Sequence, residues 1–129
     1  MSEETANYGP EPTYFVEPPD CREMTLNEYQ ALAMETAIYP SPIIYPALEI
    51  CGDAGEIADK VKKVMRDENG AFTLANKYEI AKEVGDVLWG IANIAHDLGY
   101  SLEEIAQMNY DKLKSRQLRG KLGGNGDNR

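Results

Sequence analysis

Apolar residues recur every three or four positions in four stretches of the chain, and this spacing predicts four α-helices. The predicted helices cover about residues 26–37, 46–67, 73–98 and 101–120. Thr25 with Glu28 and Ser101 with Glu104 form capping-box patterns that should open the first and last helices. No stretch alternates with the period of two typical of a β-strand. We therefore predict an all-α four-helix bundle with antiparallel neighbours where loops are short.

The second and third predicted helices each carry an apolar stripe that should face the rest of the protein. The stripes comprise Ile50, Ile57, Val61 and Val64 on the second helix and Ile80, Val84, Val87, Leu88, Ile91 and Leu98 on the third. Acidic side chains flank each stripe, namely Asp53 and Glu56 on the second helix and Glu83 and Asp86 on the third. Because residues three positions apart share a helix face, four carboxylates should converge if these helices pack side by side.

Four carboxylates at close range repel one another, and their pKa values should be raised. Hard divalent cations relieve that repulsion, and a ligand set made only of oxygen atoms favours Mg²⁺ or Mn²⁺ over Zn²⁺. The residues alone leave open a second interpretation, in which each pair lies on an ordinary solvent-exposed face. Four glycines within the helical patterns favour the metal site, because they cost stability and suggest that a backbone or a ligand approaches closely. They are Gly52, Gly55, Gly85 and Gly90.

The chain has 129 residues, which is enough for one domain, and a net charge of −9. Such an acidic balance disfavours nonspecific binding to nucleic acid or to an anionic membrane, so neither is expected as a partner. No stretch is apolar for long enough to form a signal core or to span a membrane, and we expect a reduced, cytoplasmic compartment. Cys51 is expected as a buried thiol within a helix, although pairing with Cys21 stays open.

Three segments of the chain resemble the motifs of the MazG-type all-α nucleotide pyrophosphohydrolases. ALEICGDAGEI (47–57) and EVGDVLW (83–89) are similar to the family's E-x-x-E and E-x-x-D helices, and NYDKLKSR (109–116) to its N-x-x-K-L-x-x-R segment. The resemblance implies a helical domain over about residues 25–119. An extended, proline-rich arm is expected over residues 1–24, and a flexible, glycine-rich tail over 120–129.

The resemblance implies roles for individual acidic residues of this chain. The implied Mg²⁺ ligands, which could also hold Mn²⁺, are Asp53, Glu56, Glu83 and Asp86. Asp53 stands where the family commonly has glutamate, and Glu49, one turn earlier on the same flank, could supply the missing carboxylate or orient the attacking water. The expected catalytic residues are therefore Glu49 and Glu56.

Basic and amide side chains are expected to contact the phosphates of a substrate. These expected substrate-binding residues are Asn109, Lys112, Arg116, Lys60 and Lys63. Lys112 and Arg116 lie one helical turn apart, and cations near a helix C-terminus are favoured even without a function. The resemblance implies that these two residues clamp phosphates. For Lys60 and Lys63, salt bridges with nearby acids explain the pattern equally well.

Several aromatic and polar side chains are candidates for the core or for recognition of a base. Trp89 is expected in the core, and Tyr29 is equally consistent with the core and with stacking on a base. Gln30 and Thr36 could read a base edge. His96 is expected to be structural or exposed, because a di-iron site would need E-x-x-H pairs that the chain lacks.

The resemblance predicts a magnesium-dependent hydrolase that cleaves a nucleoside triphosphate to the monophosphate and pyrophosphate. Two alternatives stay open: a catalytically weakened helical module that regulates or binds another protein, and a hydrolase of an alarmone such as ppGpp. The sequence does not indicate which base is preferred. We also expect a homodimer or homotetramer, because four short helices leave apolar faces that one small bundle cannot cover, and because the resembled family assembles in this way.

Overall fold

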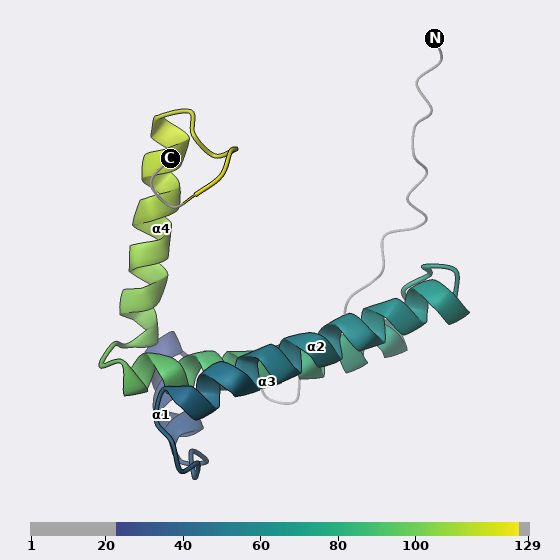
Figure 1. The fold of residues 1–129 in the computed structure, drawn as a ribbon, viewed down its shortest axis with the longest axis horizontal. Coiled ribbons are helices and arrows are strands. Elements are labelled where there is room, and N and C mark those ends of the chain that lie inside the picture. Colours follow the sequence, from purple (N-terminus) through teal and green to yellow (C-terminus); the bar gives the residue numbers. More distant parts are fainter. Residues whose placement is uncertain (1–22, 127–129) are drawn as a thin grey trace.

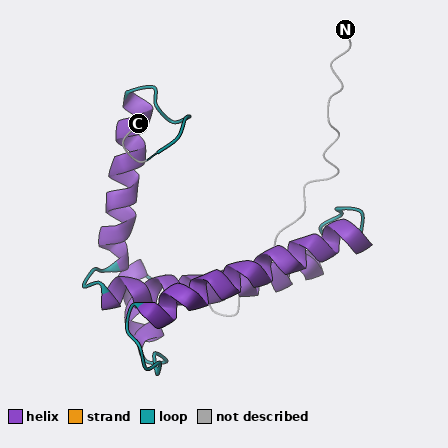
Figure 2. Cartoon of the chain, in the orientation of Figure 1, coloured by secondary structure: helices purple, strands orange, loops and turns teal. Residues whose placement is uncertain are grey.

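The computed structural model describes residues 23–126, and all regular structure in this part of the chain is helical (Figures 1 and 2). The helices are α1 (Leu26–Met34), α2 (Ile44–Asp67), α3 (Leu74–Asp97) and α4 (Leu102–Leu118). The predicted all-α architecture with four helices is confirmed. Most of the expected N-terminal arm, Cys21 and the last three residues of the expected tail lie outside the described residues.

Helices α2 and α3 form a long antiparallel pair, and this pair dominates the packing of the chain (Figure 1). Helix α1 packs across α3 at one end of the pair, and α4 begins at that same end. Among the described residues α4 contacts α1 and α3 but not α2. It points away from the pair, so the four helices of one chain do not lie side by side as four parallel rods.

Local signals start the helices as expected. The Thr25 hydroxyl accepts a hydrogen bond from the Glu28 backbone N–H (3.1 Å), and the Glu28 carboxylate accepts one from the Thr25 N–H (2.8 Å). Ser101 and Glu104 form the same reciprocal pair at 3.1 and 2.8 Å. Both predicted capping boxes are therefore confirmed, because each satisfies two backbone donors that a helix start leaves without a partner.

The first two helices differ from the predicted boundaries by two or three residues. Helix α1 ends at Met34 because the next backbone N–H groups bond three residues back, as in a 3₁₀ turn, and the Thr36 hydroxyl caps the Ala33 carbonyl at 2.9 Å. Helix α2 begins at Ile44, which places Pro46 in the first turn, where a missing N–H costs nothing.

The buried core lies where α1, the second half of α3 and the start of α4 meet. Its buried residues are Ala33, Ala92, Ala95 and Leu102, and Tyr29, Trp89, Ile91 and Ile105 pack against them, partly buried. The core position expected for Trp89 is thus confirmed, and Tyr29 also belongs to the core. His96 is exposed, as one of its two expected positions.

Gln30 is a structural residue, and the expectation that it reads a base edge is wrong. Its side chain is only 8% exposed. Its amide nitrogen donates to the carbonyls of Ala92 (3.2 Å) and Tyr100 (3.0 Å), and its amide oxygen accepts from the Leu102 N–H (3.0 Å). All of its hydrogen bonding is therefore used to join α1 to α3 and to the start of α4.

The face of α3 that meets α2 differs from the predicted stripe. Val84, Leu88 and Leu98 are exposed, whereas Glu83 and Gly90 are buried. At Gly90 an added Cβ would lie 2.7 Å from Ile50 Cγ1, so the expected close approach is confirmed there. At the other three helical glycines, Gly52, Gly55 and Gly85, no atom of another segment within residues 23–126 lies within 4 Å of such an atom. No backbone of these residues approaches them, and the approach of a ligand stays a prediction.

Cys51 is exposed, so the expected buried thiol is wrong. Its neighbour Ile50, by contrast, packs against Gly90 of α3. A helical pattern places a residue on one side of a helix, but which side is buried depends on the partner helix.

None of the helices in residues 23–126 combines the length and apolar character needed to cross a membrane.

Candidate active site

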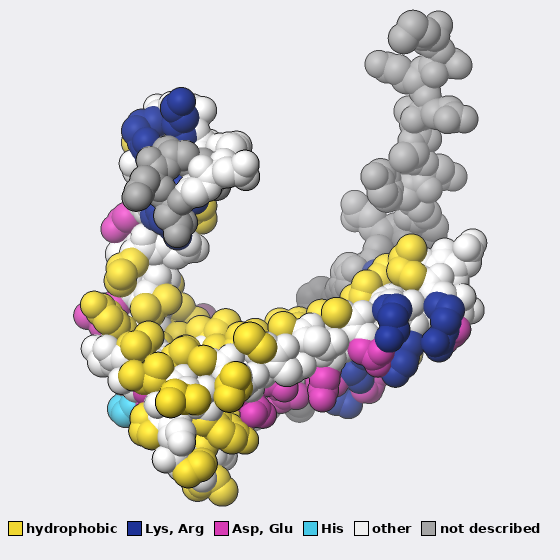
Figure 3. Space-filling view, viewed as in Figure 1, with side chains coloured by type: hydrophobic (Ala, Val, Ile, Leu, Met, Phe, Trp, Pro, Cys, Tyr) yellow, Lys and Arg dark blue, Asp and Glu magenta, His cyan; other side chains and the backbone are white. Residues whose placement is uncertain are grey.

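The acidic pairs of α2 and α3 meet in the middle of the antiparallel pair. Asp53 and Glu56 lie on α2, and Glu83 and Asp86 lie opposite them on α3. Glu83 is only 9% exposed, Asp53 is half-buried, and the other two are exposed. Figure 3 shows acidic side chains gathered along this stretch, between an apolar region at one end of the pair and basic side chains at the other.

Mutual repulsion perturbs the ionisation of these carboxyl groups. Burial raises the pKa of the Asp53 carboxyl, and neighbouring negative charges raise it further. Those charges belong to Glu49, Asp86 and Glu83. A hydrogen bond to Glu83, together with its charge, raises the pKa of Glu56. The two acidic pairs therefore face each other across the helices as the spacing predicted, and the expected rise in pKa is present at Asp53 and Glu56. At Glu83 the expectation is wrong, because the pKa of that carboxyl is lowered.

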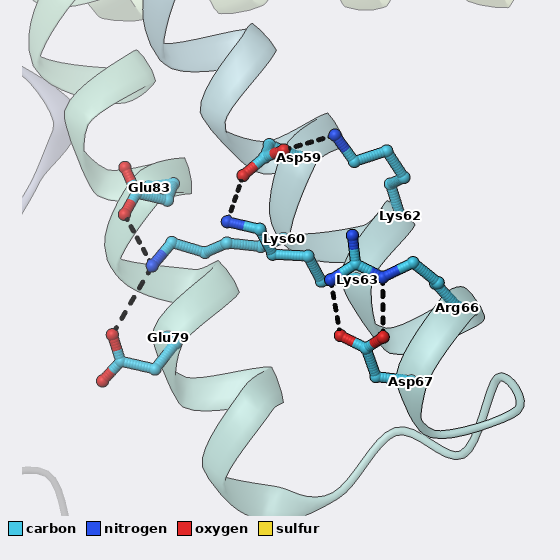
Figure 4. A network of polar contacts seen from close by, with 8 residues as sticks. All are labelled: Asp59, Lys60, Lys62, Lys63, Arg66, Asp67, Glu79 and Glu83. Atoms are coloured by element: carbon cyan, nitrogen blue, oxygen red, sulfur yellow. Dashed lines mark hydrogen bonds and ion pairs between the residues drawn. The ribbon is translucent and has the colours of Figure 1, made fainter.

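Lys60 supplies the nearest positive charge to this cluster (Figure 4). Its ammonium lies 3.1 Å from Glu83 Oε1 and 3.6 Å from Glu79 Oε2. The hydrogen bond from Lys60 is the main cause that lowers the pKa of Glu83. Within residues 23–126, no three acidic, histidine or cysteine side chains stand in an arrangement that could hold a metal ion. Lys60 thus neutralises part of the charge that a cation would otherwise balance.

The other basic residues of α2 are paired with acids beyond the carboxylate cluster. Lys62 and Lys63 both contact Asp59 at 2.6 Å, and together they lower the pKa of Asp59 to about 2. Arg66 forms a two-pronged contact with Asp67 at 2.6 and 2.7 Å (Figure 4). The sequence left open whether Lys60 and Lys63 bind phosphates or form salt bridges with nearby acids. In the structure both lysines form such salt bridges.

Glu49 lies one turn before Asp53, as expected for a group that supports the cluster. Its charge and a hydrogen bond raise the pKa of Tyr45, and Asp53 adds to this shift. Glu49, Tyr45 and Asp53 therefore lie along one face of α2.

The residues expected on the fourth helix lie apart from the carboxylates within one chain. Asn109 and Lys112 are exposed, whereas Arg116 is only 5% exposed. The Arg116 guanidinium donates to the Gly126 carbonyl at 3.5 Å, and the Lys121 N–H donates to the Arg116 carbonyl at 2.7 Å. The chain after α4 therefore turns back along the helix. A single chain does not bring these residues to α2, which α4 does not touch within residues 23–126.

Sequence reasoning missed the aromatic residues that lie beside the carboxylates. Tyr39 and Tyr45 stack with ring centroids 5.2 Å apart, and Trp89 meets Tyr39 edge-on at 6.2 Å. Asp97 accepts a hydrogen bond from the Tyr39 hydroxyl at 2.9 Å. Burial is the larger cause, and this hydrogen bond the second, that together raise the pKa of Tyr39 to about 12. A signal was present in the segment YPSPIIYP (39–46), which carries two tyrosines among helix-breaking prolines.

Comparisons with known proteins identify the family. Residues 47–119 match the MazG nucleotide pyrophosphohydrolase domain, and this match contains both acidic pairs. The chain belongs to that family. Over 114 residues it is 41% identical to the Gene 37 protein of Mycobacterium phage L5. The aligned region covers 82% of this chain and all of the phage protein. No solved structure matches the chain.

Proposed function

We propose that the protein hydrolyses nucleoside triphosphates to nucleoside monophosphates and pyrophosphate in a magnesium-dependent reaction. Membership of the family supports nucleotide pyrophosphohydrolase chemistry. The observation that carries the proposal is that the two acidic pairs face each other across α2 and α3. Burial and the neighbouring carboxylates raise the pKa of Asp53, and a hydrogen bond to Glu83 raises the pKa of Glu56. An all-oxygen set with unbalanced negative charge suits Mg²⁺, with Mn²⁺ as a substitute.

Asp53, Glu56, Glu83 and Asp86 are the residues that would hold the metal. When bound, Mg²⁺ polarises a phosphate and lowers the pKa of water. Lys60 pairs with Glu83 at 3.1 Å, and a cation bound there would release its ammonium to contact a phosphate. Glu49, one turn before Asp53, would accept the proton of an attacking water or orient that water. No covalent intermediate on the protein is required.

A panel of nucleotides tests this proposal against its rivals. Pyrophosphate release from each deoxynucleoside triphosphate is measured with Mg²⁺ and with chelator, and ppGpp hydrolysis is measured in parallel. We expect release from triphosphates only when Mg²⁺ is present. The second candidate is a helical module that regulates or binds another protein and does not hydrolyse nucleotides. Two features favour it: aspartate stands at position 53 in place of the family's glutamate, and the Lys60 ammonium forms a salt bridge with Glu83. Metal-saturated protein that hydrolyses no compound of the panel would favour that candidate.

A second copy of the chain is part of the proposal. Large apolar side chains on the α2–α3 pair are strongly exposed, including Leu48 (68%), Met65 (59%) and Val84 (51%). Exposed apolar area of this kind is typical of an interface. The expected phosphate contacts Asn109, Lys112 and Arg116 also lie apart from the carboxylates, so only another copy could bring such residues to them.

We therefore expect the full chain to sediment as a homodimer or homotetramer at micromolar concentration. Burial of the apolar side chains of α2 and α3 against a partner supplies the driving force. Sedimentation velocity at several concentrations measures the assembly. A monomer that persists across the micromolar range would contradict both the assembly and the shared site.

A further inference from the structure

Lys60 reaches from α2 to α3 and places its ammonium between two carboxylates of α3 (Figure 4). The ammonium lies 3.1 Å from Glu83 Oε1 and 3.6 Å from Glu79 Oε2. Glu79 and Glu83 are one helical turn apart, so they share a face of α3. Glu83 is one of the four residues assigned to the metal and Glu79 is not. Lys60 therefore links the carboxylate cluster to an acidic side chain outside it.

The two carboxylates that Lys60 contacts differ in their exposure to water. The side chain of Glu83 is 12% exposed, whereas that of Glu79 is 47% exposed. A nearly buried carboxylate needs a partner, because little water reaches its charge. Glu79 is better solvated and also binds Lys82 of its own helix at 2.9 Å. Glu83 therefore depends on a cation from another helix, whereas Glu79 does not.

An open hollow of about 330 Å³ gives the Lys60 side chain room to move. Lys60 and Glu79 are among the described residues that line it, and Glu83 is not. The hollow extends to Glu68 and Thr73, at the turn between α2 and α3. Because the lysine stem has four flexible carbons, the ammonium can leave Glu83 through side-chain rotation alone and remain against Glu79.

The Lys60 ammonium and a divalent cation are attracted to the same carboxylate. Two positive charges held by Glu83 at such short range repel each other, and this repulsion is stronger in a partly buried site than in bulk water. Whatever stabilises the pair of Lys60 with Glu83 therefore weakens the binding of a cation there, because the two equilibria are linked. Whatever holds the displaced ammonium strengthens that binding.

We propose that Lys60 is a positioning residue that competes with the divalent cation for Glu83, and that Glu79 receives its ammonium when the cation binds. The two residues together set the affinity of the site for the metal, Lys60 by lowering it and Glu79 by raising it. An ammonium held at Glu79 stays within one helical turn of the cluster. The proposal rests on the proposed function, because it takes the carboxylate cluster as the metal site.

The direct test is the binding of Mn²⁺ to the full-length chain without nucleotide, measured by electron paramagnetic resonance of the free ion. Lys60→Met keeps an unbranched stem and removes the ammonium. We expect the Kd for Mn²⁺ to fall by about tenfold, because a charge-assisted hydrogen bond to Glu83 no longer competes. Lys62→Met is the matched control, since it removes an exposed ammonium of the same helix that pairs with Asp59. Its Kd should stay within about threefold of wild type, because salt screens exposed charges.

Glu79→Gln removes the second partner of Lys60 and should have the opposite effect. We expect the Kd for Mn²⁺ to rise by about threefold, the size typical of one exposed ion pair, because the displaced ammonium no longer meets a carboxylate. Glu68→Gln is the matched control, since Glu68 lines the same hollow but accepts its hydrogen bond from Asn76. Its Kd should stay close to that of wild type.

A double variant distinguishes action through Lys60 from a general loss of negative charge. If Glu79 acts through Lys60, adding Glu79→Gln to Lys60→Met should change the Kd by less than about 1.5-fold, because the interaction between the two residues is already gone. An equal rise of the Kd in both backgrounds would show that Glu79 contributes only its charge, and its assigned role would be overturned.

The outcomes separate this proposal from the proposed function. If wild-type protein binds Mn²⁺ and Lys60→Met binds it no more tightly than Lys62→Met does, competition at Glu83 is overturned while the metal site stands. If wild-type protein binds no Mn²⁺, both proposals fail. Circular dichroism checks the fold of each variant. Should Lys60→Met not fold, Glu79→Gln still decides the matter, because a Kd equal to that of Glu68→Gln overturns the exchange.

Discussion

Asp86→Asn is expected to lower kcat/KM for pyrophosphate release by at least about 100-fold, because a neutral amide removes one of the charges that hold the metal against the phosphates. The helical fold should persist, since Asp86 is exposed and helix α3 does not depend on its charge. Circular dichroism measures the fold, and pyrophosphate release in saturating Mg²⁺ measures the activity.

The same variant gives a readout that does not depend on turnover. Mg²⁺ should raise the melting temperature of wild-type protein, because a ligand that binds only the native state stabilises it. In Asp86→Asn this rise should be lost or strongly reduced. Asp67→Asn is the matched control, since Asp67 lies at the end of α2 and pairs with Arg66. Wild-type turnover by Asp86→Asn, or turnover that ignores Mg²⁺, would refute the assignment of these carboxylates.

Gln30→Ala is expected to destabilise the fold by about 3 kcal/mol, because it leaves buried backbone groups without partners. Those groups are the carbonyl of Tyr100 and the N–H of Leu102, whereas the Ala92 carbonyl keeps its bond within helix α3. Each buried group without a partner costs about 1–3 kcal/mol, and the truncated side chain also leaves a cavity. Urea unfolding, monitored by circular dichroism, gives the free energy of unfolding.

A surface glutamine supplies the comparison for this prediction. Gln107 is exposed on α4 and its amide donates to Asp111 at 2.7 Å. Gln107→Ala should change the free energy of unfolding by less than about 0.5 kcal/mol, because water replaces an exposed hydrogen bond. Equal effects of the two substitutions would show that the network around Gln30 does not hold α1 in place.

Local signals explain why so much of the helical architecture could be predicted. The capping boxes at Thr25 and Ser101 act over three residues, and the Asn69-Gly70 pair ends α2 with positive φ values of 53° and 76°. Such features need no partner elsewhere in the chain. The meeting of the acidic pairs was also predictable, because a short connection between two amphipathic helices makes them antiparallel neighbours.

The rotation of each helix about its own axis could not be predicted with the same success. The apolar pattern of α3 suggested that Val84, Leu88 and Leu98 are buried, yet they are exposed, and Glu83 with Gly90 faces α2 instead. Glu83 tolerates burial because Lys60 approaches it from the neighbouring helix. Likewise, Cys51 is exposed although its helix is amphipathic.

The sequence by itself determined four helices, their caps and the spacing that turns four carboxylates toward one another, since each of these depends on residues a few positions apart. Only the tertiary structure decided the role of Gln30, the direction of α4 and the stacking of Tyr39 on Tyr45. These features depend on contacts between residues some 50 to 70 positions apart, such as those of Gln30 with Tyr100 and of Tyr39 with Asp97. Contacts of that range follow from how the helices pack, which no local pattern encodes.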